Sequence, residues 1–131
     1  NTHTTAWCLK SYSIGADGVL PWNSIGDTSA LHEPVQTALL IPGSRFGEKV
    51  ITSYRIHALR EGGQLSELLN ILCREKNITR EQAGAMVTKF VPLGGQYQQE
   101  FADEAAEVVF SDLEPGAFIS LKEAILKLLD H

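Results

Sequence analysis

Four acidic residues, Glu100, Asp103, Glu104 and Glu107, follow the three- and four-residue spacing that brings side chains together on one side of an α-helix. No Lys or Arg stands among them. Each like-charge pair costs roughly 0.2 to 0.5 kcal/mol, which a domain of ordinary stability tolerates. Such carboxylates attract a basic protein and pair with its Arg or Lys side chains. The alternative is a solvated helix face that serves solubility alone.

The segment that contains these carboxylates supplies the whole acidic excess of the chain. Between Phe90 and Leu121 there are six acids and no Lys or Arg, whereas the remaining residues include eleven basic and ten acidic side chains. This charge disfavours nucleic acid, because phosphate binding depends on Lys and Arg. We therefore predict an acidic domain that binds a basic protein. The favoured class, by analogy, is an immunity or inhibitor protein that neutralises a basic toxin or nuclease.

Arg45 and Phe46 form a second candidate for contact with a partner. They lie in the connector PGSRFG between two segments that are expected to form a hairpin. Arg and aromatic residues carry much of the binding energy of protein interfaces. The connector is only faintly similar to a phosphate-binding loop, since its glycines are separated by three residues instead of four. An ordinary surface loop is the alternative.

His32, Glu33 and His57 are the candidates for acid–base chemistry or ligand binding. His32 and Glu33 lie in the polar segment 23–34, the longest expected loop, and His57 lies in the expected hairpin. The alternative function is therefore a small enzyme or ligand-binding domain that uses this loop, although the pattern favours a protein without catalytic activity. His32 and Glu33 are too few to hold a metal ion, so we predict no metal and no cofactor.

The two cysteines, Cys8 and Cys73, lie far apart in the chain and fit no disulfide or zinc pattern. We expect reduced thiols that pack in the core, and a catalytic pairing of Cys73 with His57 is the weaker interpretation. Residues 69–90 match the skeleton of a helix-turn-helix, which makes a DNA-binding regulator a minor alternative. It is disfavoured because VPLGG cannot continue as a reading helix.

The secondary structure follows from periodicity and capping signals. β-Branched and aromatic residues near the start and alternation after Val50 indicate strands, whereas leucines at helical spacing after Gln64 indicate a helix. Thr79 with Gln82, and Ser120 with Glu123, match capping boxes. The predicted strands lie near 4–14, 35–41 and 48–59, and the predicted helices are 64–76, 80–90, 96–110 and 121–130.

Strands followed by helices predict an α+β fold, in which a small antiparallel sheet packs against about four helices. The length of 131 residues and the lack of an internal repeat predict one domain, 1–131. No apolar run approaches the roughly 18 residues that span a bilayer, and no secretion signal is recognised at the start. We therefore expect no membrane contact and a cytoplasmic location.

Overall fold

The computed structural model describes residues 2–21, 24–25, 32, 38–98, 107–110 and 112–130. Its elements are α1 (Thr2–Ser13), β1 (Leu40–Pro42), the 3-10 helix η2 (Ser44–Phe46), β2 (Val50–Thr52), α2 (Tyr54–Lys76), α3 (Arg80–Phe90), β3 (Gly95–Gln98), β4 (Glu107–Phe110) and α4 (Pro115–Leu129). The α+β class predicted from the sequence is confirmed. The strands form two separate antiparallel pairs, β1–β2 and β3–β4.

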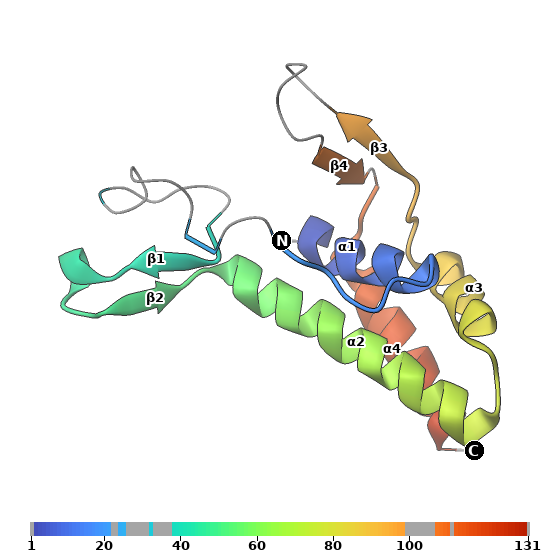
Figure 1. Ribbon diagram of the computed structural model, residues 1–131. Coiled ribbons are helices and arrows are strands. Elements are labelled where there is room, and N and C mark those ends of the chain that lie inside the picture. Colours follow the sequence, from blue (N-terminus) through green and yellow to red (C-terminus); the bar gives the residue numbers. More distant parts are fainter. Residues whose placement is uncertain are drawn as a thin grey trace.

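The four helices form one body from which both strand pairs project (Figure 1). The long helix α2 is central, with α1 and α4 packed against it and α3 beside its C-terminal end. The β1–β2 hairpin extends beyond the N-terminal end of α2, and β3–β4 extends away from the helices on the side of α1. None of the helices in the described ranges is long and apolar enough to cross a membrane.

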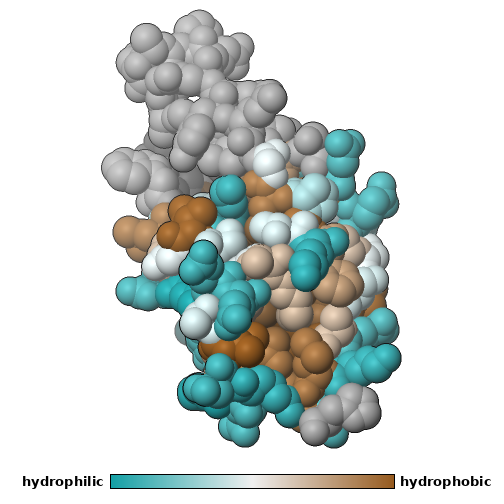
Figure 2. Space-filling view, turned by 90° about the vertical axis from the view of Figure 1, so that its right-hand side faces the viewer, coloured by the Kyte–Doolittle hydropathy of each residue, from teal (hydrophilic) through white to brown (hydrophobic). Residues whose placement is uncertain are grey.

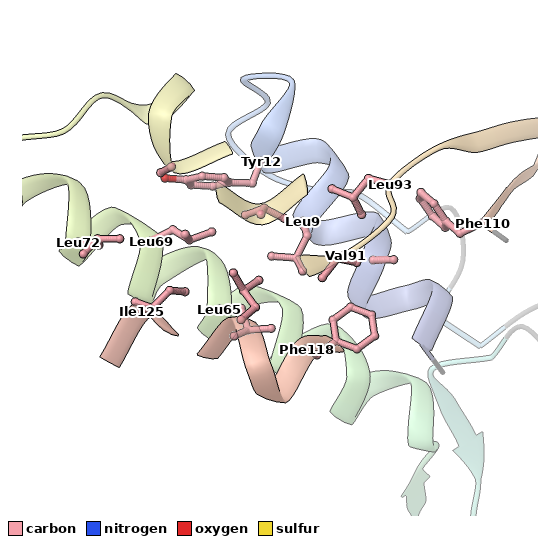
Figure 3. Packing of buried hydrophobic residues seen from close by; sticks show 14 residues of the cluster. Leu9, Tyr12, Leu65, Leu69, Leu72, Val91, Leu93, Phe110, Phe118 and Ile125 are labelled. Atoms are coloured by element: carbon pink, nitrogen blue, oxygen red, sulfur yellow. The ribbon is translucent and has the colours of Figure 1, made fainter. Parts of the chain in front are cut away.

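The core lies between the helices, and Figure 3 shows its side chains converging from α1, α2 and α4. Leu65, Leu69 and Leu72 are buried, which confirms the leucine face predicted for α2. Asn77 ends this helix in the left-handed conformation with φ 50°. The prediction of 80–90 is confirmed to the residue, including the capping box of Thr79 and Gln82.

The strand predicted at 4–14 is wrong, because Thr2–Ser13 forms helix α1. Its buried residues include Thr5, Cys8, Leu9 and Tyr12, which follow helical spacing. The β-branched and aromatic residues suggested a strand. The free energy gained by burying this face against α2 is larger than the intrinsic strand preference of these residues, which is small for each residue.

The strand predicted at 48–59 is right only at Val50–Thr52, since α2 begins at Tyr54. Ser53 is the N-cap, and its side chain accepts a hydrogen bond from the Arg55 N–H. Gly62 lies inside α2, although the helix was predicted to begin only at residue 64. A Cβ at Gly62 would lie 2.6 Å from Cys8 Cβ, so this glycine allows α1 and α2 to approach closely.

The strand predicted at 35–41 is also displaced. β1 covers Leu40–Pro42, and residues 35–37 lie outside the described residues. Pro42 has no backbone N–H and cannot donate a hydrogen bond. In this register the backbone nitrogen of residue 42 points away from β2, so proline breaks no hydrogen bond between the two strands.

The helix predicted at 96–110 is wrong at both of its ends, and residues 99–106 lie outside the described residues. β3 and β4 pair here as an antiparallel ladder, with Tyr97 opposite Val108 and Gln98 opposite Glu107. The run Val108–Phe110 is β-branched and aromatic, and Phe110 is buried in the core beside α1. The backbone N–H and carbonyl groups of β3 bond to those of β4. Hydrophobic periodicity within one segment does not reveal pairing between two segments.

The helix predicted at 121–130 begins earlier, at Pro115, which occupies the first helical turn. Ser120 is therefore inside α4 and does not serve as its cap. Leu121 and Ile125 are buried as predicted, whereas Leu128 is 46% exposed.

Candidate functional site

The predicted acidic stripe is contradicted at Glu107, which does not lie in a helix. Glu107 lies in β4, whereas Glu100, Asp103 and Glu104 lie outside the described residues. The pairing of Gln98 with Glu107 nevertheless brings the two ends of this acidic segment together. We call residues 99–107 the acidic segment.

The β1–β2 hairpin carries the second predicted contact, Arg45 and Phe46. Both residues belong to η2 at the tip, where the Phe46 side chain is 66% exposed and the Arg45 side chain lies outside what the structure describes. Val50 and Tyr54 are also exposed, at 57% and 81%. The hairpin therefore presents apolar side chains to solvent at its tip and along β2, an arrangement that suits contact with a partner.

The histidines do not form a recognisable catalytic site within the described ranges. His57 Nε2 lies 3.4 Å from Thr52 Oγ1, at the junction of β2 and α2. His32 is exposed, and Glu33 lies outside the described residues. No group of three His, Cys, Asp or Glu side chains in the described part of the chain is placed to hold a metal ion.

A groove that the sequence did not indicate runs between α1 and α2. It has a volume of about 470 Å³, and its polar side chains include Ser66, Glu67 and Asn70 from α2. The start of α3 closes one end, where the Arg80 guanidinium lies 4.5 Å from the centre of the Tyr12 ring. The size is that of an ordinary small-molecule pocket.

Arg80 is fully engaged at this end of the groove. Its Nε donates to the Tyr12 carbonyl at 3.2 Å, and its other nitrogens donate to the Ala16 carbonyl and to the Asp17 carboxylate. Two carbonyls near the C-terminal end of α1 are thereby satisfied by a cation, as the helix dipole favours. Arg80 therefore holds α1 and α3 together, and it offers little to a ligand. Nothing in the sequence near Arg80 points to this contact, which joins residues more than sixty positions apart.

Cys8 and Tyr12 line the same groove, and Cys73 contacts the Tyr12 hydroxyl. Burial raises the pKa of the Cys8 thiol above its ordinary value. Burial, and then the hydrogen bond with Cys73 Sγ at 3.7 Å, raise the pKa of Tyr12. Both cysteines are free, as predicted. The raised pKa values keep the Cys8 thiol and the Tyr12 hydroxyl protonated near neutral pH, which argues against a thiolate nucleophile at Cys8.

Apolar surface is also found on the face of the molecule that includes α3. Figure 2 shows apolar atoms bordered by hydrophilic ones on the face formed by α3 and by the C-terminal ends of α2 and α4. Met86, Phe90 and Leu129 are among the residues that pack at the margin of the core while remaining partly accessible.

Comparisons with protein-family models, with curated proteins and with solved structures found no match for this chain. The geometry of the described residues therefore carries the functional argument alone.

Proposed function

We propose that this chain is a protein-binding domain whose partner is basic, and that it belongs to the class of immunity or inhibitor proteins that neutralise a basic toxin or nuclease. The contact surface is the acidic segment, with Glu100, Asp103, Glu104 and Glu107, assisted by Arg45 and Phe46 on the β1–β2 hairpin.

The strand pairing of β3 with β4 is the observation that carries the proposal. Partners in an antiparallel ladder lie about 5 Å apart, so Gln98 and Glu107 hold the two ends of the acidic segment at one place. Three further acids lie between these ends, and no Lys or Arg does. The stretch of chain that starts and ends at this pair therefore includes four of the acids of the chain.

The position of the strand pair also supports the proposal. Phe110, at the end of β4, is 3% exposed and anchors the hairpin on the core, while β3 and β4 extend away from the helices (Figure 1). Glu107 lies at the end of this ladder that is farther from Phe110. Negative charge there accelerates the encounter with a cationic surface, and this effect weakens as the salt concentration rises.

The test compares two double charge reversals that change the net charge equally. Glu104→Lys with Glu107→Lys alters the acidic segment, whereas Glu75→Lys with Glu123→Lys alters exposed carboxylates on α2 and α4. Binding to a panel of purified small basic nucleases is measured at low and high ionic strength. We expect the first variant to associate at least about tenfold more slowly at low salt, with a smaller effect in the second.

Two outcomes contradict the proposal. An equal loss of association rate in the two variants would show that net charge matters and the acidic segment does not. Failure of the unaltered chain to bind any member of the panel at low salt would reject nucleases as the partner class.

A further inference from the structure

One face of helix α2 is turned away from the core. α1 and α4 pack against other sides of the helix, and its buried leucines face the core. At about 100° per residue, six residues lie together on the remaining side. The four in the middle are exposed, and the two at the ends are half-buried. We call this set the α2 face, and it consists of Ile56, Arg60, Gly63, Gln64, Glu67 and Ile71.

The α2 face is symmetric about the midpoint of residues 56–71. Ile56 and Ile71 lie at equal distances from this midpoint, and so do Arg60 and Glu67. When a second α2 lies antiparallel across the midpoint, Arg60 of each copy falls opposite Glu67 of the other. The isoleucine at each end falls opposite the other isoleucine of the second copy. The face is therefore complementary to itself in the antiparallel direction.

The two charges of the α2 face are not neutralised by their own helix. The positions three and four residues away from Arg60 and from Glu67 carry no opposite charge. The two residues are about 10 Å apart along the helix axis, which is too far for them to pair with each other. Within the described ranges, the ion pair that the structure forms joins Arg80 and Asp17 instead. A second copy supplies the missing opposite charge to both residues, and such pairs fix direction and register.

Gly63 leaves room for a second helix at the midpoint of the α2 face. No atom lies within 4 Å of the position that its Cβ would take, so packing inside one copy does not require glycine here. A glycine inside a helix is less stable than alanine. Hollows lie on both sides of α2, and Gly63 borders each of them. The distance between two packed helices is set by the side chains at their contact, so glycine there permits a close approach.

We propose that two copies of this chain associate through the α2 face, with their α2 helices antiparallel and a twofold axis at the midpoint of residues 56–71. Residues 54–73 of the two copies then overlap over about 30 Å. An interface of this kind is isologous, because the same surface serves both copies. The β1–β2 hairpin extends beyond the N-terminal end of α2, so the two hairpins lie at opposite ends of the helix pair (Figure 1).

The first test fills the space at the twofold axis. Gly63→Leu places a large side chain there in both copies, so we expect dimerisation at least about tenfold weaker than in the unaltered chain. Gly116→Leu is the matched control, because it makes the same change at an exposed position of α4 with nothing within 4 Å of its Cβ position. Sedimentation of the full chain over increasing concentration measures dimerisation, and circular dichroism shows that both variants keep the fold.

The second test uses the charges to fix the register. Arg60→Glu and Glu67→Arg each place like charges opposite each other twice, so each variant alone should dimerise at least about tenfold more weakly at low salt. An equal mixture of the two variants should associate again, because every Glu then faces an Arg. The double variant with both changes in one chain should also dimerise. Glu81→Arg, at an exposed position of α3, is the control and should have little effect.

A chain that stays monomeric up to millimolar concentration overturns the proposal. Equal dimerisation of Gly63→Leu and Gly116→Leu places the interface elsewhere and also overturns it. The same holds when the mixture of Arg60→Glu and Glu67→Arg associates no better than either variant alone. The acidic segment takes no part in these tests, so failure here is distinguishable from failure of the proposed function.

Discussion

The helical body and the β1–β2 hairpin differ in how they use their apolar residues. Each of the four helices turns residues at helical spacing into the shared core, and Leu9, Leu69 and Ile125 are fully buried there. In the hairpin, no residue of β1 or β2 is fully buried. Stability therefore resides in the body, whereas the apolar side chains of the hairpin are available for contact with another molecule. The following predictions test this division, from the largest effect to the smallest.

The largest effect is expected from truncation in the body compared with truncation at the hairpin tip. Leu69→Ala removes a fully buried side chain, so the free energy of unfolding should fall by about 2 to 5 kcal/mol. Phe46→Ala removes a side chain that is 66% exposed and should change it by less than about 0.5 kcal/mol. Urea denaturation followed by circular dichroism measures both. Comparable losses would contradict the division between body and hairpin.

The next effect concerns the contact between α1 and α2. Gly62→Ala should lower the free energy of unfolding by about 1 to 3 kcal/mol, because the new Cβ would lie 2.6 Å from Cys8 Cβ and 3.2 Å from the Thr5 carbonyl oxygen. Gly63→Ala is the control, since nothing lies within 4 Å of its Cβ position. It should stabilise the helix by about 0.5 to 1 kcal/mol. The same denaturation measurement applies, and equal signs for the two variants would refute the close approach.

These comparisons also show what the sequence could and could not predict. The leucine face of α2 and the start of α3 follow from local spacing and from a capping box, so both were predicted correctly, and Leu65 and Leu72 are buried. Helix α1 is stabilised by packing against α2, which approaches it closely at Gly62, more than fifty positions from Cys8. Local propensity does not include such distant contacts and predicted a strand. β3 and β4 likewise form through pairing between segments, whereas the sequence was interpreted as one continuous helix.

Among the candidate sites, too, some residues were predicted from the sequence and others were not. Phe46 was predicted as a partner contact from its place in the hairpin connector, and its side chain is exposed. Whether it contacts a partner stays a prediction. The contacts of Arg80 with the end of α1 were not foreseen, because no periodicity or motif marks a side chain that caps a distant helix. Whether the acidic segment binds a partner stays a prediction.

A smaller effect is expected at the junction of α1 and α3. Arg80→Lys keeps the charge but loses the forked guanidinium that reaches two carbonyls and Asp17. The free energy of unfolding should fall by about 1 to 2 kcal/mol. This value is near the lower limit for the contribution of hydrogen bonds to charged groups, because the Arg80 side chain is 35% exposed. Asp17→Asn is the control and should matter far less, since its side chain is fully exposed. Thermal unfolding measures both, and a larger loss in Asp17→Asn would contradict the role of the carbonyls.

The smallest effect is a dependence of stability on alkaline pH. The pKa values of Cys8 and Tyr12 are raised in the folded chain, so the unfolded chain loses these protons first. Their contribution is fully present below the ordinary pKa values, which are 9.0 for Cys and 10.0 for Tyr, and it is lost as the pH rises above them. Tyr12→Phe should therefore reduce the slope of stability against pH in the alkaline range. Tyr54→Phe, at an exposed position, should leave the slope unchanged.

Helix α2 has one more consequence for how this molecule could work. It runs without interruption over 23 residues, which at 1.5 Å per residue makes a strut of about 34 Å. The hairpin sits at one end of this strut and the turn into α3 at the other. This length separates the hairpin from the turn into α3, so one molecule bound at each end would be held apart from the other. A force applied to the hairpin would be transmitted to α2.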